Sequence, residues 1–209
     1  MYLPEHFAEV DVREVSQIIE SGPLACIVAQ TETGLVANHI PLFAGPDGDL
    51  IGHIALANDL HRLLDFGHEV LAIFQGDDAY VSPNFYPGKT DHHRVVPTWN
   101  YQVVHVHGTI SFQHDVVSKH RAVALLTRMH ERRLNGDEAW QMRDAPQDFV
   151  DDMLANIVAL RISVSRTVAK SKLSQNRDAR DYIGAIDGLR ASGQGNMADR
   201  MAQKMRESS

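Results

Sequence analysis

Two polar segments interrupt apolar, strand-like runs and concentrate groups that can bind a ligand. The first covers residues 96–101 and brings Thr98, Trp99 and Asn100 together. The second covers residues 170–177 and ends a long β-branched stretch. Polar groups that are buried without partners cost roughly 1–3 kcal/mol each, so such clusters indicate a bound molecule. We therefore predict that both segments line a site for a polar, partly aromatic, anionic ligand.

The first segment combines flat apolar surface with hydrogen-bonding groups. Trp99 and Tyr101 supply aromatic faces, while Thr98 and Asn100 supply hydrogen bonds. This mixture suits a planar heteroaromatic ring. The alternative is that the two aromatic residues belong to the core beside a turn.

The second segment is rich in cations and amides. Its candidate ligand-binding residues are Lys172, Ser174, Gln175, Asn176 and Arg177. The planar guanidinium of Arg177 matches phosphate or carboxylate, and Ser174 and Gln175 can bond to ring heteroatoms. The alternative is a solvated strand end with a basic tail.

Two further places could bind a phosphate. At residues 52–59 a predicted strand gives way to a helix, where free backbone N–H groups attract anions and where His53 and Asn58 could add donors. The alternative there is a plain turn with an asparagine cap. Lys89 ends an aromatic and proline-rich segment, residues 80–89, and is a further candidate phosphate contact.

No catalytic residue or metal ligand set stands out. The chain has 12 histidines, but none lies at a familiar spacing from Cys, Asp or Glu, so no metal is expected. A Gly-x-Ser-x-Gly nucleophile motif is also missing. Tyr86 and His107 remain candidates for acid–base chemistry.

The elements that must position these residues are mostly short strands. Apolar alternation and turn residues predict strands near residues 24–30, 35–43, 49–54, 70–75, 79–82, 100–113 and 157–168. Helical periodicity is found over residues 11–19, 58–66, 116–134, 178–191 and 196–207, and a further helix begins near residue 147. This pattern predicts a mainly β fold with α elements, an antiparallel barrel with helices packed on it. A glycine-rich phosphate motif after a first strand is missing, which disfavours a Rossmann domain.

Composition restricts the class of protein. The 209 residues carry a net charge of −7, which argues against a broad basic surface for nucleic acid. Cys26 is the only cysteine, and no apolar run reaches the 18 or so residues of a membrane span, so we expect a cytoplasmic protein that does not bind membranes. The terminal helix, residues 196–206, is the only candidate DNA contact and is more typical of a capping helix.

Seven stretches in order along the chain closely resemble the PaiB family of FMN-binding negative transcriptional regulators. They are Met1-Tyr2-x-Pro4-x-His6-Phe7, His39-Ile40-Pro41-Leu42, Gly52-His53-x-Ala55-x-Ala57-Asn58, Ala72-Ile73-Phe74-Gln75-Gly76, Ala79-Tyr80-Val81-Ser82-Pro83-x-x-Tyr86-Pro87, Val96-Pro97-Thr98-Trp99-Asn100-Tyr101 and Lys172-Leu173-Ser174-Gln175-Asn176-Arg177.

The resemblance implies a homodimer of six-stranded antiparallel split barrels that binds FMN at the subunit interface. By this resemblance residues 53–58 lie near the phosphate, residues 98–100 approach the isoalloxazine edge, and residues 172–177 add polar contacts. It divides the chain into a barrel domain, residues 1–175, and a helical extension, residues 176–209. Two alternatives stay open. One is an FMN-dependent oxidoreductase of the pyridoxamine-phosphate-oxidase-like or flavin-reductase group, and the other is a haem-handling protein of the same fold.

Overall fold

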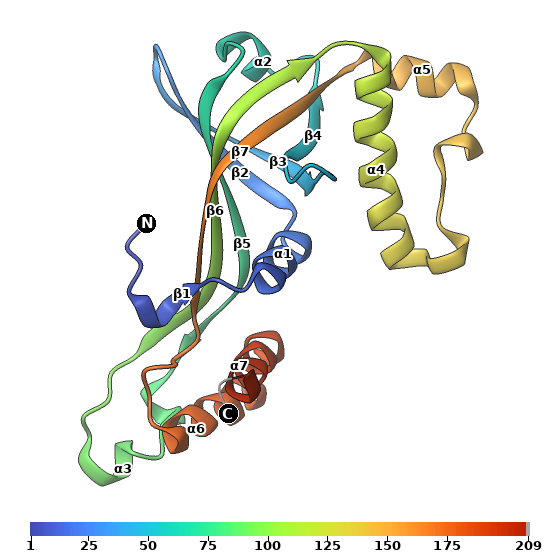
Figure 1. Ribbon diagram of the computed structural model, residues 1–209. Helices are drawn as coiled ribbons and strands as arrows, with labels where there is room; N and C mark the ends of the chain where they lie inside the picture. The colour runs from blue at the N-terminus through green and yellow to red at the C-terminus, as the bar shows by residue number, and fades with distance from the viewer. Residues whose placement is uncertain (208–209) are drawn as a thin grey trace. The chain divides into compact units, whose positions relative to one another are not determined.

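The computed structural model describes residues 1–207, and its strands form one antiparallel sheet (Figure 1). The strands are β1 (Ala8–Glu9), β2 (Leu24–Thr31), β3 (Gly34–Ala44), β4 (Leu50–Ala55), β5 (His68–Val81), β6 (Thr98–Gln113) and β7 (Ile157–Lys172). They are ordered β1-β7-β4-β3-β2-β5-β6, and a further pairing of β7 with β6 closes six of them into a ring. The predicted six-stranded antiparallel barrel is thus confirmed, with β1 as a two-residue addition at β7.

Helices flank this sheet and form the end of the described chain. The α-helices are α1 (Val12–Ser21), α2 (Leu60–Leu63), α3 (Lys89–His92), α4 (Val116–Asn135), α5 (Gln147–Ala155), α6 (Ala179–Ala191) and α7 (Gly195–Glu207). The 3-10 turns are η1 (Glu5–Phe7), η2 (Pro83–Phe85), η3 (Gly136–Glu138) and η4 (Met142–Asp144). Within residues 1–207, none of the helices combines the length and apolar composition needed to cross a membrane.

The chain forms two compact units, and strands β5, β6 and β7 contribute to both. Of the described residues, the helical unit contains 1–21, 75–104 and 168–207, and the barrel unit contains 22–74 and 105–167. The predicted boundary after residue 175, between a barrel domain and a helical extension, stays a prediction.

The barrel unit is held together by strands whose alternate residues face its core. In β2, the buried residues Ala25, Ile27 and Ala29 alternate with partly exposed neighbours, as a strand with one buried face requires. At Gly108 in β6, a Cβ atom would lie 2.4 Å from the carbonyl oxygen of Ser163 in β7. Any larger residue would therefore force these two strands apart, and glycine permits the contact that closes the ring.

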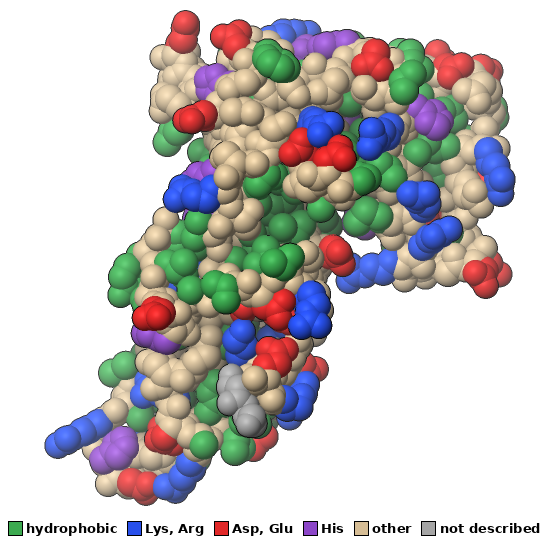
Figure 2. Space-filling model, viewed as in Figure 1, with side chains coloured by type: hydrophobic (Ala, Val, Ile, Leu, Met, Phe, Trp, Pro, Cys, Tyr) green, Lys and Arg blue, Asp and Glu red, His purple; other side chains and the backbone are tan. Residues whose placement is uncertain are grey.

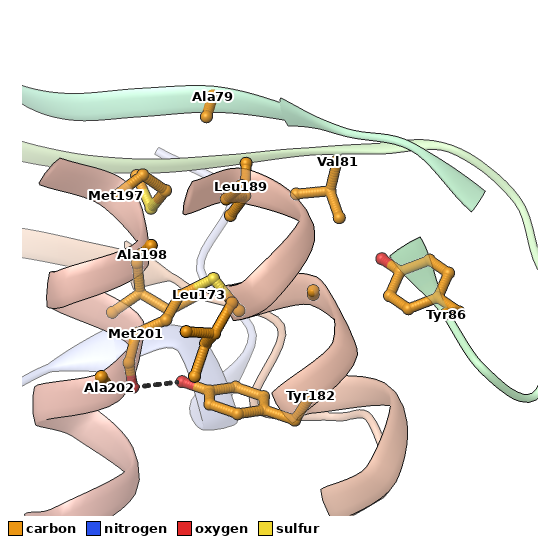
Figure 3. Packing of buried hydrophobic residues seen from close by; sticks show 12 residues of the cluster. Ala79, Val81, Tyr86, Leu173, Tyr182, Leu189, Met197, Ala198, Met201 and Ala202 are labelled. Atoms are coloured by element: carbon orange, nitrogen blue, oxygen red, sulfur yellow. Dashed lines mark hydrogen bonds between the residues drawn. The ribbon is translucent and has the colours of Figure 1, made fainter. Parts of the chain in front are cut away.

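The helical unit has its own core, in which α6 and α7 pack on residues from the strands (Figure 3). Leu173, Leu189 and Met201 are almost completely buried there. The hydroxyl of Tyr182 donates a 2.9 Å hydrogen bond to the carbonyl oxygen of Met201, and burial raises the pKa of this phenol to about 12. The two helices are therefore built into a continuous core rather than attached as a loose tail.

Strand β5 is longer than the sequence pattern predicts. The sequence pattern predicts separate strands at residues 70–75 and 79–82 with a Gly-Asp-Asp turn between them, but β5 continues through residues 76–78. Tertiary partners hold this part extended, because Asp77 pairs with Arg200 at 3.2 Å and Asp78 accepts a 3.0 Å bond from the Trp99 indole. The predicted turn is wrong because these contacts outweigh the turn preference of Gly-Asp-Asp. They involve residues far away in the sequence, which the local pattern cannot reveal.

The buried face of α4 is narrow. Val117 and Met129, two apolar residues of the predicted helix at residues 116–134, are 77% and 40% exposed. Ala122 is buried instead, and Lys119 is nearly so. The helix thus contacts the barrel along a narrow stripe and leaves much of its circumference open.

Candidate functional site

Lys172, the last residue of β7, joins the two polar segments within the helical unit. Its Nζ lies 2.5 Å from the Oγ1 of Thr98 and 2.5 Å from the carbonyl oxygen of Trp99. Because β6 pairs with β7, the start of one strand and the end of the other lie side by side. The two predicted segments therefore meet, and Lys172, Thr98 and Trp99 form the centre of what we call the cation cluster.

Lys170, two residues earlier on β7, adds a second cation to this cluster. Only 5% of its surface is exposed, and its ammonium group donates a 3.2 Å bond to the carbonyl oxygen of Tyr2. It also lies 5.4, 5.9 and 5.2 Å from the ring centroids of Tyr2, Phe7 and Tyr101. Aromatic faces attract a cation, but they do not neutralise its charge.

Arg177 completes the cluster, which we define as Lys170, Lys172 and Arg177 with Thr98 and Trp99. Its guanidinium carbon lies 4.6 Å from the ring centroid of Tyr86. Burial lowers the pKa of Lys172, and the nearby charges of Lys170 and Arg177 lower this pKa further. Within residues 1–207, none of the three cations forms an ion pair. Partly buried cations that repel one another without a carboxylate favour binding of an anion.

Trp99 of the cluster has an exposed aromatic ring, and the exposed ring of Tyr80 lies beside it. Trp99 and Tyr80 expose 51% and 50% of their surfaces, and their ring centroids are 6.1 Å apart in an edge-to-face arrangement. The indole Nε1 of Trp99 donates to Asp78, which fixes the orientation of the ring. The cluster thus combines positive charge with ordered aromatic surface, as an aromatic phosphate ester would require.

Asn100 and Ser174 lie next to the cluster but are committed to the core. The hydroxyl of Ser174 donates a 3.1 Å bond to the Oδ1 of Asn100, whose amide in turn donates to the sulfur of Met201. Both side chains are buried, with 0% and 3% of their surfaces exposed for Asn100 and Ser174. Ser174 has a φ of 66°, in the left-handed region, so the pair holds the chain in a tight turn after β7. Their role in the structure is to shape the segment that carries Arg177.

The remaining predicted residues of the helical unit make only local contacts. Gln175 accepts a 2.7 Å bond from the amide of Leu173 and donates a 2.6 Å bond to the carbonyl oxygen of Ser171, so both ends of its amide group are used. Asn176 is exposed. Lys89 donates to the side chain of Asn84.

His53 and Asn58 belong to the barrel unit. The ring of His53 lines an apolar hollow of about 200 Å³ with Phe149 and Met153, and its buried Nδ1 has no hydrogen-bond partner in the described chain. Burial lowers the pKa of this imidazole and favours its neutral form. Asn58 donates to Asn38 and accepts from the amide of Leu60, and the helix that follows has only four residues. Asn58 thus forms a side-chain turn just before the helix, whose N-cap residue is Asp59, and such a short helix offers little dipole for a phosphate.

The two acid–base candidates differ in accessibility. Tyr86 is 1% exposed within the core of the helical unit, which places it out of reach of a substrate. The Nε2 of His107 is 3.1 Å from an Arg166 nitrogen, and its pKa is lowered by burial and by the charge of Arg166. Among residues 1–207, no three His, Cys, Asp or Glu side chains gather as metal ligands.

Comparison with solved structures defines the class of fold. The chain is similar to the flavocytochrome Anf3 from Azotobacter vinelandii, with a TM-score of 0.62 and 16% identity over 87% of this chain and 78% of that one. It is also similar to an FAD and heme binding protein from Mycobacterium smegmatis, with a TM-score of 0.61 and 17% identity over 85% of this chain and 79% of that one. At these identities the likeness shows the fold, a split barrel with flanking helices.

Sequence comparison then gives the family. Residues 1–166 match the family described as "Putative FMN-binding domain", so the chain belongs to that family. It is also 29% identical to the protease synthase and sporulation protein PAI 2 of Bacillus subtilis, over 99% of both chains. The predicted PaiB resemblance and the assignment to an FMN-binding family are thereby confirmed. The match to the family ends before Lys170, so it includes Thr98 and Trp99 but not the cations of β7.

The cations and rings of the cluster fit FMN. A phosphate can pair with the cations Lys170, Lys172 and Arg177, and the exposed faces of Trp99 and Tyr80 suit a planar ring. Sequence reasoning did not select Lys170 or Tyr80 as site residues. Both residues belong to segments that the sequence singled out, residues 170–177 and 80–89, but alternation along a strand does not reveal which face meets a ligand.

Proposed function

We propose that this chain binds FMN at the cation cluster. The observation that carries the proposal is the concentration of Lys170, Lys172 and Arg177 without an ion-pair partner in the described chain. In this proposal the three cations hold the phosphate, and Thr98 and Trp99 contact the flavin. Bound FMN would supply redox chemistry, while the residues of the chain bind it and orient it.

We further propose that the protein acts as a homodimer, with FMN at the subunit interface. The barrel unit supports this with an apolar strip on the outer side of its sheet. Cys26 and Val28 of β2 lie beside Ile73 and Leu71 of β5 in register, and all four are only partly buried. A second copy would cover this strip and would exclude water from it.

The cellular role that we propose is negative regulation of transcription, as in the PaiB family. Helix α7 is a poor candidate for direct DNA contact, because Arg200 is paired with Asp77 and Lys204 with Glu9 at 2.8 Å. These charges hold the terminal helix in the helical unit. Regulation would then depend on the state of the flavin or on a partner rather than on a basic recognition helix.

A paired set of variants tests the flavin site. The double variant Thr98→Ala with Arg177→Ala removes a hydroxyl and a guanidinium from the cluster. Its control, Thr90→Ala with Arg180→Ala, removes the same groups from the same unit, where Thr90 bonds to the carbonyl oxygen of Pro87 and Arg180 pairs with Asp91. We expect FMN titration, followed by flavin absorbance and fluorescence, to show strong loss of affinity in the first variant only.

Size-exclusion chromatography of both variants checks that the dimer survives. Equal FMN affinity in the two double variants would show that the site lies elsewhere. A colourless wild-type protein that fails to bind added FMN would refute the proposed function as a whole.

A further inference from the structure

A cleft of about 760 Å³ in the barrel unit lies between α4 and the segment that follows it, residues 136–143. Figure 2 shows Lys and Arg side chains gathered over this part of the molecule. The volume falls within the range of about 300–1,000 Å³ that small-molecule sites occupy. The cleft consists entirely of barrel-unit residues, and none of them belongs to the cation cluster.

One wall of the cleft is a stripe of arginines on α4. Arg121, Arg128 and Arg132 line the cleft and are spaced by seven and four residues, which places them on the same face of a helix. Arg143 lines it from η4. Asp137 is the only carboxylate among the lining residues, so the lining is strongly positive.

These four arginines are available to a ligand. All are exposed, and none forms an ion pair within residues 1–207. The nearby acid Glu131 is already engaged, because its carboxylate accepts a 2.8 Å bond from the Asn135 side chain and a 3.0 Å bond from the Trp140 amide. The second contact ties the segment after α4 to the helix and thereby positions Trp140.

Trp140 gives the cleft an aromatic surface. Its side chain is 44% exposed, and it lines the cleft with Leu125 and Met142. Trp140 and Met142 also line the adjoining apolar hollow that contains His53. A ligand that fits this arrangement has several negative charges on a planar, partly apolar body.

We propose that this cleft binds a nucleoside polyphosphate, with the phosphates on the arginines and the base against Trp140. The site is separate from the proposed FMN site and would give the protein a second small-molecule ligand. A concave site with an aromatic wall favours a nucleotide over duplex DNA, which is read mainly by elements that project into a groove. Arginine is well suited here, since its planar guanidinium can bind phosphate oxygens in pairs.

Calorimetric titration of the full chain with ATP, AMP and adenosine tests the site. We expect affinity to fall from ATP to AMP to adenosine, because each step removes charge that the arginines attract. The double variant Arg128→Ala with Arg132→Ala should weaken ATP binding roughly ten- to a hundredfold, since it removes charge-assisted hydrogen bonds. The control Arg62→Ala with Arg133→Ala removes the same charge from the barrel unit outside the cleft and should bind ATP as wild type does.

Fluorescence locates the bound base. The chain has two tryptophans, so Trp99→Phe leaves Trp140 as the only one, and ATP should change its emission. The proposal is overturned if ATP does not bind, if the arginine variant binds it as well as the control does, or if Trp140 emission stays constant. Duplex DNA that binds through Arg128 and Arg132 and is not displaced by ATP would also overturn it and would identify a nucleic-acid surface instead.

Discussion

The cation cluster of the helical unit and the cleft of the barrel unit lined by Arg121, Arg128, Arg132 and Arg143 both concentrate positive charge. They differ in the desolvation free energy that this charge costs the folded chain. Lys170 is buried and Lys172 is partly buried, so folding desolvates both lysines to different extents, and neither pairs with a carboxylate within residues 1–207. The cleft arginines remain exposed and keep their hydration. Desolvation is the expensive part of placing a charge in a protein, so only the cluster should lower the stability of the ligand-free chain.

The comparison suggests two designs for an anion site. A desolvated cluster makes strong, oriented contacts with its ligand but lowers the stability of the ligand-free protein, as expected for the site of a resident cofactor. An exposed cleft binds its ligand more weakly and with greater sensitivity to salt, but it hardly lowers the stability of the protein. This is expected for a ligand that exchanges with solution.

The largest effect is expected for Lys172→Met. Because this lysine contacts Thr98 and Trp99 at the centre of the cluster, its loss should weaken FMN binding roughly ten- to a hundredfold. Flavin titration monitored by fluorescence measures the change. Lys89→Met is the control, because Lys89 bonds locally to Asn84. Equal losses in the two variants would mean that the phosphate is held outside the cluster.

The next effect concerns stability. Lys170→Met keeps an apolar stem of similar volume and removes a buried charge, so the ligand-free protein should become more stable by about 1 kcal/mol while FMN affinity falls. Arg128→Met in the cleft should change stability by less than about 0.5 kcal/mol, as expected for an exposed site. Thermal and urea unfolding of both variants provide the measurement. A destabilised Lys170→Met protein would show that the aromatic rings more than compensate its charge.

The sequence allowed the barrel and the centre of the cluster to be predicted, for a physical reason. Strand alternation predicted the barrel, whereas Thr98, Trp99 and Lys172 were selected by residue type, since they lie just outside the predicted strands 100–113 and 157–168. In the structure β6 and β7 extend to these residues, and the pairing of the two strands brings them together. Asn100 and Ser174 show the limit of this reasoning. A polar pair that satisfies itself inside a core has the same residue types as a pair that binds a ligand, and only the hydrogen bond between them distinguishes the two cases.

The cleft illustrates a different limit. The spacing of Arg121, Arg128 and Arg132 is visible in the sequence, but an arginine stripe is usually a solvated helix face. The opposing wall depends on the turn at residues 136–143, which brings Arg143 and Trp140 back toward the helix. That turn is fixed by the contact of Glu131 with the Trp140 amide, nine residues away, which local periodicity cannot predict.

A pH titration separates the two regions by their chemistry. The folded-state pKa of Lys172 lies below its unfolded value because of burial and the charges of Lys170 and Arg177. In the window between those two values the unfolded chain binds more protons, so stability of the ligand-free protein should rise with pH. FMN affinity should fall in the same window as Lys172 loses its charge. Arginine stays protonated, so ATP binding at the cleft should not change there.

Unfolding and binding curves recorded over the same alkaline range test this prediction. The Lys172→Met protein is the control, because it should lose both pH dependences in that window. Parallel loss of FMN and ATP affinity would indicate general unfolding rather than titration of Lys172.

The smallest expected effect is the difference in salt dependence. The Debye length shrinks from about 10 Å at 0.1 M salt to about 3 Å at 1 M, and exposed charges are screened more strongly than buried ones. ATP affinity should therefore decrease more steeply with added salt than FMN affinity, because the cleft arginines are exposed and Lys170 is buried. Titrations of both ligands at several salt concentrations give the two slopes. If the FMN slope were the steeper one, the cluster would have to open to solvent when it binds, and its contrast with the cleft would be lost.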